Sequence, residues 1–397
     1  MKDFSYVFRE CSGLTGNIPE NLFVNCSNVT NFAGIFMYCR GLTGNIPEKL
    51  FTNCTKVTSF GYDYPNNAYG GAFCGCRGLT GNIPENLFET CTEVTNFGST
   101  FYDCTGLTGS IPEKLFANCL KVKSFSATFY GCSGLTGNIP ENLFANCKDV
   151  ENLGFNYYGC FTGCTGLTGS IPENLFVNCS KVKGSESIFS GCSGLTGSIP
   201  ENLFSNFTNV TSFFHAFYGC SGLTGSIPEN LLTNCTKVIL FTSTFNGCSG
   251  LTGNIPENLF INCHNVTSFS GVFGGCSKLT GSIPENLFAN CPNVTNFSTV
   301  FYGCAGLTSI PENLFANCQN VKDFSNVFSK CMGLTSIPAK LFENCTSAST
   351  FYSAFYECSG LTGNAPELWK RTSVNGSRCF YNCTNLSNYA DIPSSWR

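Results

Sequence analysis

The most reactive side chains in this sequence belong to its 28 cysteines, and 25 of these recur at two fixed positions. One position is the Cys of F-x-x-C, from Cys11 to Cys383, and the other is the Cys of N-C, from Cys26 to Cys345. Thiols at regular spacing can form disulfides or bind zinc. Position 207 belongs to the second set but holds Phe207, which would leave a partner thiol unpaired in a crosslinked framework. We therefore favour buried free thiols that pack as small apolar side chains, over disulfides and over a metal site.

Three cysteines lie outside the two sets, and we expect them to be the more reactive thiols: Cys74, Cys160 and Cys379. The two histidines, His215 and His264, fall at different phases of the repeat, so they build no repeated site. No nucleophile, base and orienting acid recur at a recognisable spacing, and no glycine-rich phosphate motif is present. The sequence thus predicts no enzyme activity, no cofactor and no bound metal.

A carboxylate also recurs once per repeat, as in Glu20, Glu48 and Glu85, and only Ala339 interrupts the series. Such a row could attract divalent cations or a basic partner. We favour the simpler interpretation that each Glu stabilises the start of a helical turn and stays solvated. The recurring Asn of N-C, as in Asn25, is interpreted as a ladder of hydrogen bonds at a turn.

All of these positions belong to one string, F-x-x-C-x-G-L-T-G-[N/S]-I-P-E-N-L-F-x-N-C-x-x-V-T-x-F, which occurs thirteen times. The Leu of L-T-G recurs at Leu14, Leu42, Leu79, Leu107, Leu135, Leu167, Leu195, Leu223, Leu251, Leu279, Leu307, Leu334 and Leu361. A fixed period of this length indicates a solenoid. We predict an α/β repeat solenoid, a right-handed coil of about 13 units of 28 residues with a parallel β-sheet face.

Within each coil, L-T-G-N-I is the better candidate for the main parallel sheet and V-T-N-F for a second one. The alternative, that V-T-N-F-x-x-x-F forms the main sheet, stays open. The intervening I-P-E-N-L-F-x-N-C is interpreted as a single helical or 3-10 turn, because Pro suits a first helical position. Of the 39 phenylalanines, 36 fall at three positions of the string, which predicts a core of stacked rings.

The ends of the array differ from its middle. Residues 1–13 form an incomplete first repeat, and residues 364–397 diverge, with Trp369 and Trp396, in the manner of a C-terminal cap. We assign 1–397 to a single solenoid. Its first coil has no visible cap, so upstream residues or a partner are expected to cover it, and end-to-end self-association through that coil is one possibility.

Two repeats are lengthened at the same place, between V-x-x-F and F-x-x-C, by segments rich in Tyr, Asn and Gly. These residue types favour adaptable binding loops. The alternative, the more common outcome for insertions, is a neutral surface loop. The candidate ligand-binding residues are Tyr62, Asp63, Tyr64, Asn66, Asn67, Tyr69, Phe155, Asn156, Tyr157 and Tyr158.

The string resembles that of the BspA-like leucine-rich repeat proteins, which carry F-x-x-C-x-x-L-T-x-I-x-I-P. Phe36, Cys39 and Leu42 match the beginning of that motif, and Ile46 and Pro47 match its end. The resemblance implies a leucine-rich-repeat solenoid of the kind found on the surfaces of bacteria and some protozoa, often linked to adhesion. The period departs from the usual shorter unit through the added E-N-L-F-x-N-C.

The charge and hydropathy of the chain exclude some classes of binding partner. The net charge is −4 with scattered Lys and Arg, which argues against nucleic acid and against anionic membranes, and no apolar run is long enough to span a bilayer. We predict a non-catalytic recognition or adhesion module that binds a protein or glycan through its sheet face and the two Tyr-rich loops. The alternative is a structural spacer, stalk or filament element. We expect a cell-surface or extracellular location reached through upstream sequence, since no signal peptide is visible, and an intracellular location stays open.

Overall fold

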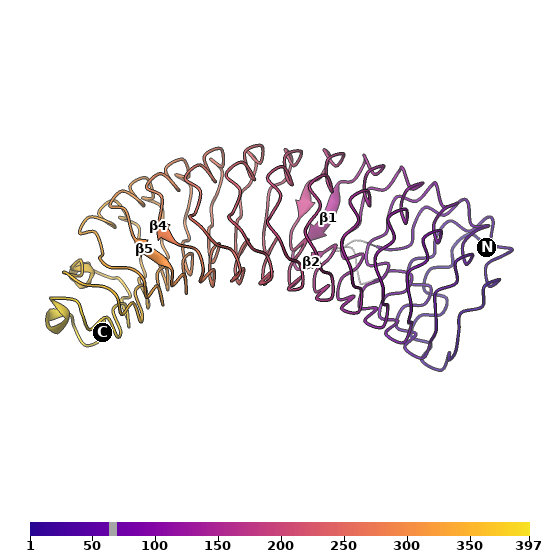
Figure 1. Cartoon of the computed structure of the whole chain (residues 1–397), viewed down its shortest axis with the longest axis horizontal. Helices are drawn as coiled ribbons and strands as arrows, with labels where there is room; N and C mark the ends of the chain where they lie inside the picture. The colour runs from indigo at the N-terminus through magenta and orange to yellow at the C-terminus, as the bar shows by residue number, and fades with distance from the viewer. Residues whose placement is uncertain (63–69) are drawn as a thin grey trace. The chain divides into compact units, whose positions relative to one another are not determined.

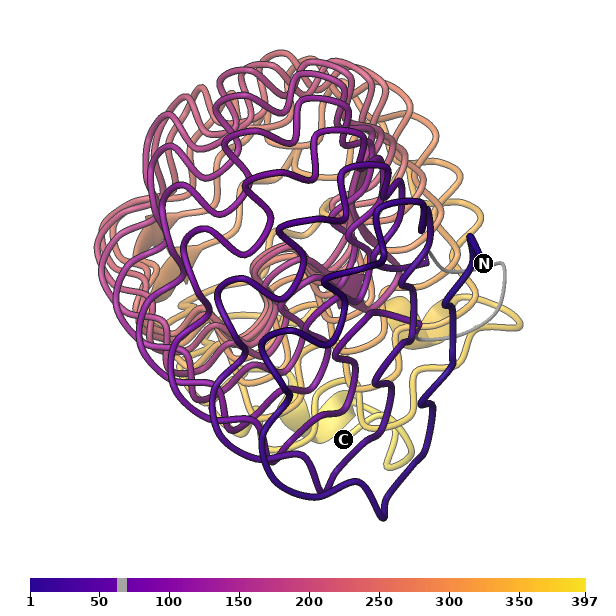
Figure 2. The same ribbon diagram turned by 90° about the vertical axis from the view of Figure 1, so that its right-hand side faces the viewer.

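In the computed structural model, which describes residues 1–62 and 70–397, the chain forms two compact units, Met1–Val210 and Thr211–Arg397. Each unit is a stack of coils, one sequence repeat per coil (Figure 1). In Figure 2, which faces the N-terminal end, the first coils of the first unit lie one behind another. The solenoid that the period predicts is therefore present in each unit.

Regular secondary structure is sparse. The strands are β1 (Asn152–Phe155), β2 (Tyr158–Gly159), β3 (Gly184–Ser185), β4 (Gly281–Ser282) and β5 (Leu307–Ser309). β1 pairs with β2 antiparallel and with β3 parallel, and β4 pairs with β5 parallel. Most other coils are joined by single parallel bridges at two positions of the repeat, such as Asn31 with Ser59 and Gly16 with Leu42.

The main ladder between coils runs along V-T-x-F-x-x-x-F rather than along L-T-G. In the first coil, the amides of Phe4, Tyr6 and Phe8 donate to carbonyl oxygens of the next coil at 2.9–3.0 Å. The L-T-G segment supplies one such bond per coil, as from the Thr43 amide to the Gly16 oxygen at 2.9 Å. The expectation that L-T-G-N-I forms the main sheet was wrong, and the alternative describes the ladder.

Left-handed residues explain why this ladder contains so few strands. The Ile35 amide donates to the Phe32 oxygen at 3.1 Å across Gly34, whose φ is +67°. Four residues later the turn repeats around Tyr38, with φ +59°. A positive φ at the third residue is the mark of a type II turn. A coil without an insertion thus crosses this face as two consecutive β-turns, which interrupt regular strand geometry while their outward amides still bond to the next coil.

The predicted helical turn is also a series of β-turns. The Leu50 amide donates to Pro47 at 3.2 Å and the Cys54 amide to Phe51 at 2.8 Å, each closing one i to i+3 turn. No α-helix occurs in residues 1–62 and 70–397, so the helical part of the α/β class is absent there. Starting a helix has an entropic cost that a segment of this length cannot offset, because it could form only a few helical hydrogen bonds.

The phenylalanines form the core, as predicted. Within a column the rings are stacked, as Phe73 on Phe101 at 5.6 Å and 4° between planes. Between columns they are tilted, as Phe88 against Phe97 at 4.7 Å and 55°. Both are favoured geometries for aromatic pairs, and these side chains are fully buried.

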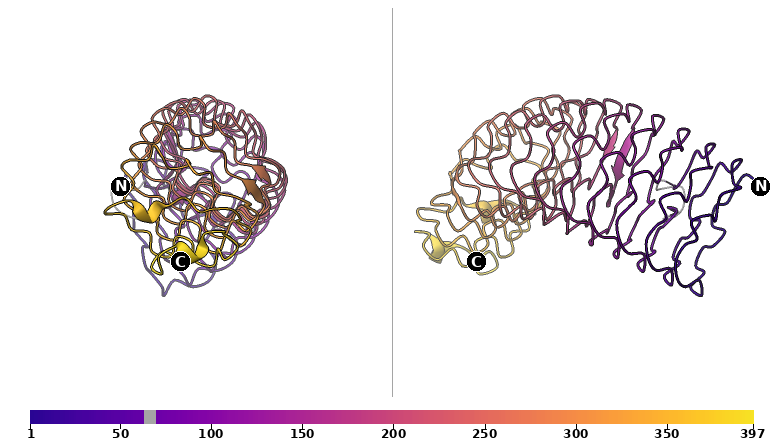
Figure 3. Two further views of the ribbon diagram at one scale, coloured as in Figure 1. Left: turned by 90° about the vertical axis from the view of Figure 1, so that its left-hand side faces the viewer. Right: turned by 45° about the vertical axis from the view of Figure 1, so that its right-hand side comes forward.

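The C-terminal end of the second unit carries two 3-10 helices, η1 (Leu368–Lys370) and η2 (Tyr389–Asp391), drawn yellow in Figure 3. Trp369 meets Phe380 edge-on at 6.2 Å. The buried Trp396 lies over Gly376, where an added Cβ would fall 2.1 Å from the indole ring. The capping role of residues 364–397 and the incomplete repeat at 1–13 stay predictions.

Candidate binding surface

The second insertion folds as a β-hairpin. Strands β1 and β2 are joined by Asn156 and Tyr157, with Phe155 opposite Tyr158. The Asn156 amide donates to the carboxylate of Glu186 in the next coil, and the Ser187 hydroxyl donates to the Asn156 oxygen at 2.6 Å. Because the tip is bonded to the neighbouring coil, this hairpin presents its side chains from a fixed position.

Two glycines allow the hairpin to lie against that coil. A Cβ on Gly154 would fall 2.0 Å from the Glu186 oxygen, and one on Gly159 would fall 2.0 Å from the Ser187 oxygen. Asn156 has a φ of 53°, a left-handed conformation that Asn tolerates better than most residues. The Gly and Asn content noted in the sequence therefore serves a local structural purpose.

Aromatic side chains gather around the hairpin. Phe155 is 37% exposed and Tyr157 is 57% exposed. The half-buried Tyr158 ring lies 5.8 Å from Tyr130, which stacks on Tyr102 at 4.5 Å and 6°. We call Tyr102, Tyr130 and Tyr158 the tyrosine row. Burial, followed by the neighbouring Tyr158, raises the pKa of Tyr130, so its hydroxyl stays protonated at neutral pH.

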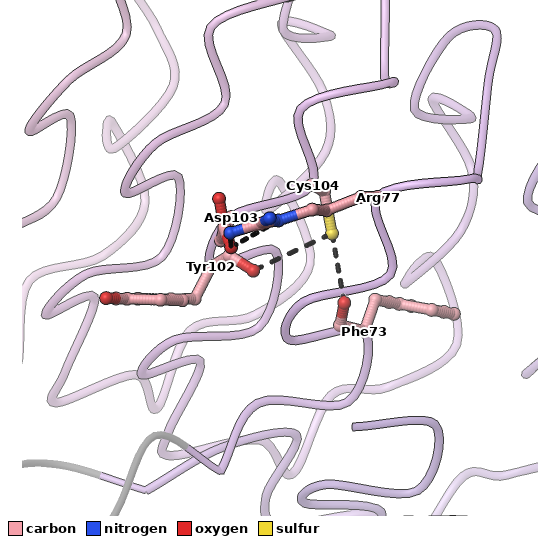
Figure 4. A network of polar contacts seen from close by, with 5 residues as sticks. All are labelled: Phe73, Arg77, Tyr102, Asp103 and Cys104. Atoms are coloured by element: carbon pink, nitrogen blue, oxygen red, sulfur yellow. Dashed lines mark hydrogen bonds and ion pairs between the residues drawn. The ribbon is translucent and has the colours of Figure 1, made fainter. Parts of the chain in front are cut away.

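Sequence reasoning missed Tyr102 and Tyr130. Both follow the Phe of F-x-x-C, in Phe101-Tyr102 and Phe129-Tyr130, and a count of Tyr at that position in adjacent repeats would have found them. Asp103, next to the row, forms an ion pair with Arg77 at 2.6 Å (Figure 4). The Asp103 carboxylate and the Arg77 guanidinium therefore lie next to the tyrosine row as an ion pair.

The first insertion is described only at its edges. The Tyr62 ring stacks on Tyr6 at 5.9 Å, and its hydroxyl accepts a hydrogen bond from Asn31 at 2.9 Å. The remaining predicted residues of this loop lie outside the described residues: Asp63, Tyr64, Asn66, Asn67 and Tyr69. Their proximity to the hairpin therefore stays a prediction.

None of the 28 cysteines, all of which lie in the described residues, forms a disulfide, and the two cysteine sets differ in their hydrogen bonding. In the F-x-x-C set the thiol donates to the Phe oxygen of the preceding coil, as from Cys104 to Phe73 at 3.0 Å (Figure 4). In the N-C set the contacts are longer, as from Cys147 to the Cys119 oxygen at 3.8 Å. This difference explains why the N-C set can lose a thiol at Phe207.

The three cysteines outside the sets are not the reactive ones we expected. Cys74, Cys160 and Cys379 are all fully buried. Burial, with a smaller contribution from Asp103, raises the pKa of Cys74 to about 12, and burial raises the pKa values of the other two well above the usual range. The thiolate is the reactive form, so desolvation makes all three inert.

The Glu and Asn positions form ladders between coils. The Asn142 amide donates to Glu113 at 2.6 Å, so this carboxylate accepts from the next coil rather than starting a helix. The predicted Asn ladder is confirmed: Asn146 donates to the Ala117 oxygen at 2.9 Å, and the pattern recurs along each unit. Where Thr90 replaces Asn, its hydroxyl donates to the Thr52 oxygen at 2.9 Å and keeps the link.

His215 lies in an aromatic stack. Burial lowers the pKa of His215 to about 4, and its ring is stacked with Phe214 at 4.0 Å and Tyr218 at 4.6 Å. Within residues 1–62 and 70–397, no three potential ligands among His, Cys, Asp and Glu converge on one point. The helices found there are three-residue 3-10 turns, too short to cross a bilayer.

Three solved structures illustrate what the chain is similar to. The ectodomain of the Arabidopsis thaliana receptor kinase GASSHO1/SCHENGEN3, in complex with CASPARIAN STRIP INTEGRITY FACTOR 2, is 22% identical over 89% of this chain, with a TM-score of 0.38. A TDR receptor is 20% identical over 89%, with a TM-score of 0.48. The Arabidopsis HAESA receptor, in complex with the peptide hormone IDA and SERK1, is 19% identical over 92% of this chain and 72% of its own, with a TM-score of 0.35. The chain spans 44% and 61% of the first two structures. No curated protein matches the sequence.

Family models match most of the chain. A model described as Mycoplasma protein of unknown function, DUF285, matches residues 95–230 and 183–313. The model of the BspA type leucine rich repeat region matches residues 16–151 and 253–397, which is more than half of the sequence. The chain belongs to the BspA-type leucine-rich repeat family.

Proposed function

We propose that this protein is a non-catalytic recognition module that binds a protein or glycan through the β1–β2 hairpin and the tyrosine row. The observation that carries the proposal is the hairpin itself: it interrupts a uniform repeat, it is bonded to the next coil, and it holds Phe155 and Tyr157 in solvent. Rigid aromatic side chains give contact area at a low cost in conformational entropy.

The family, and the protein ligands named for the receptors above, support a binding role at a cell surface. We extend the proposed surface to the Tyr-rich segment at 62–69, and we retain the right-handed coil, the single solenoid over 1–397 and the extracellular location as parts of the same proposal.

Replacing Phe155 and Tyr157 by Ser tests the hairpin. The fluorescently labelled protein is applied to a printed glycan array and to cell-free extracellular matrix, and the variant should lose at least about tenfold in retained signal. Tyr352→Ser, at an exposed tyrosine of the second unit, is the matched control and should bind normally. Unchanged retention of the hairpin variant would remove this surface from the proposal.

A structural element that associates end to end is the second candidate. The near-identical repeats support this candidate, because coils with the same stacking surface can also stack between molecules, and Leu14 belongs to the first repeat. Light scattering of the purified chain over a hundredfold concentration range should then show growing assemblies that Leu14→Lys prevents. A constant mass would exclude this candidate.

A further inference from the structure

The coil that receives the β1–β2 hairpin, residues 182–189, departs from the repeat at the points where the hairpin lies against it. It reads Gly184-Ser185-Glu186 where a regular coil reads, for example, Ser268-Phe269-Ser270. Glu186 is the only charged residue at its position of the repeat. A neutral surface insertion requires no change in the neighbouring coil. The altered sequence therefore indicates that this coil is built to hold the hairpin.

Gly184 leaves room for the first strand of the hairpin. β1 pairs with β3 in parallel, with Asn152 opposite Gly184. A Cβ on Gly184 would fall 2.5 Å from the Oδ1 atom of Asn152 and 2.7 Å from the carbonyl oxygen of Gly154. The equivalent residue in every other coil carries a side chain, so this glycine is specific to the coil that receives the hairpin.

The side chains of Glu186 and Ser187 bind the two backbone groups of one residue at the tip. The Asn156 amide donates to the Glu186 carboxylate, and the Ser187 hydroxyl donates to the Asn156 carbonyl oxygen at 2.6 Å. Asn156 lies between Phe155 and Tyr157, the two exposed aromatic residues of the hairpin. Because both backbone groups of Asn156 are held by the next coil, the chain on either side of it is held as well.

The base of the hairpin is anchored separately from its tip. The Gly159 amide donates to the Thr162 hydroxyl at 3.1 Å, and this hydroxyl donates to the backbone oxygen of Ser187 at 2.6 Å. From the preceding coil, the Ser126 hydroxyl donates to the Tyr158 oxygen at 3.0 Å. Loss of the two side-chain contacts at the tip should therefore free the tip without releasing the base.

We propose that Glu186 and Ser187 are positioning residues that hold the hairpin in its binding conformation, an assignment that rests on the proposed role of the hairpin in recognition. They act through Asn156 on the two exposed aromatic side chains and do not themselves bind the ligand. A binding conformation that is populated only part of the time lowers the apparent affinity by that fraction. The contacts at the tip avoid this loss by ordering the hairpin before the ligand arrives.

The first measurement is hydrogen–deuterium exchange of the full chain without ligand, followed in the peptide that contains residues 154–160. Glu186→Ala/Ser187→Ala should raise the exchange rate of the tip amides at least about tenfold, because the tip loses both contacts. Alanine is compatible with the backbone here, since Ala127 has a φ of 53° at the position equivalent to Ser187. Ser99→Ala, at the same position two coils before the hairpin, is the matched control and should leave the exchange unchanged. Thermal unfolding checks that each variant is folded.

The second measurement is retention on the same glycan array and extracellular matrix that test the hairpin itself. Glu186→Ala/Ser187→Ala should lose about fivefold in retained signal although Phe155 and Tyr157 are intact. Glu186→Gln keeps an acceptor oxygen for the Asn156 amide and should stay within about twofold of the parent. This rescue separates a positioning role from a charge that pairs with the ligand.

Three outcomes would overturn the proposal. Unchanged exchange at the tip would mean that other contacts hold the hairpin. Faster exchange with full retention would mean that binding does not need a fixed tip. Equal loss of retention in Glu186→Gln and in the double Ala variant would assign Glu186 to the ligand. The proposed function itself fails only if Phe155→Ser/Tyr157→Ser keeps its signal, so the two failures are distinguishable.

Discussion

At the scale of single residues, the exchange of Cys for Phe at position 207 is explained by the packing around it. In most coils the Phe of N-L-F packs on the Phe of V-x-x-F, as Phe116 does on Phe125 at 4.7 Å. In the coil of Phe176 that second position is the buried Ser185. Phe207 of the following coil instead packs on Phe176 at 5.3 Å. The larger Phe207, which stands where other repeats have Cys, thus compensates for the smaller Ser185, which stands where other repeats have Phe.

This compensation predicts the effect of restoring the consensus at one or both positions. Phe207→Cys alone should lower the free energy of unfolding by about 2–4 kcal/mol, because it leaves a cavity against Phe176 and Phe204. Ser185→Phe/Phe207→Cys should recover at least half of that loss. Urea denaturation followed by fluorescence measures both, and additive losses in the double variant would contradict the pairing.

The two cysteine sets make a second residue-scale prediction. Cys104→Ala removes a thiol donor bonded at 3.0 Å, whereas Cys119→Ala removes longer contacts of 3.6 and 3.9 Å. We expect Cys104→Ala to cost about 1 kcal/mol more, since a typical net hydrogen bond is worth that amount. Chemical denaturation of the two variants side by side is the measurement, and equal losses would mean that the thiols act only by filling space.

At the scale of the elements, the coil is held by ladders of side chains rather than by helix or strand. Two stacked turns cross the main face, a bridge joins the L-T-G segments, and the Asn of N-C ties each coil to the one before it. These links recur along each unit, so the strength of one link can be measured at a regular position and compared with a natural exception.

Asn146 and Thr90 provide that comparison. Asn146→Ala removes the bond to Ala117 and should lower the free energy of unfolding by about 1 kcal/mol. Asn146→Thr should lose less, because Thr90 makes the same link in its own coil. The variants are ranked by their denaturation midpoints. If Asn146→Thr is as unstable as Asn146→Ala, the hydrogen bond between coils is not the source of the stability that Asn146 contributes.

At the scale of the whole molecule, burial of so many thiols couples stability to alkaline pH. Burial raises the pKa of Cys91 and of Cys192 to about 12, against roughly 8.5 in an unfolded chain. Below pH 8.5 both states are protonated and the stability is complete. Above it the unfolded state releases protons that the folded state keeps, so stability is lost as the pH rises toward 12.

We therefore expect the urea midpoint to fall steadily from pH 8.5 upward, by an amount that reflects the number of buried thiols. Each such thiol contributes up to about 1.4 kcal/mol per pH unit. Cys91→Ala/Cys192→Ala should show a shallower loss than the parent across this range, with the same lysines and tyrosines in both proteins. Parallel curves would refute thiol ionisation as the cause.

The amino-acid sequence was enough to predict the solenoid, the phenylalanine core, the Asn ladder and the family. These follow from periodicity, because every coil must place the same residues at the same points. The candidate site could be predicted only in part. Phe155 and Tyr157 lie in an insertion that interrupts the repeat, whereas Tyr102 and Tyr130 occupy a variable position inside regular repeats and carry no such signal.

Which segment carries the main ladder could be seen only in the folded chain, because the ladder depends on left-handed residues such as Tyr38 and on amides that bond between coils. It also decided that Cys74, Cys160 and Cys379 are inert, since reactivity follows burial rather than sequence position. Only the stacking of coils brings side by side residues that are 29 to 38 positions apart in the sequence, such as the Asn and Glu side chains that bond between neighbouring coils.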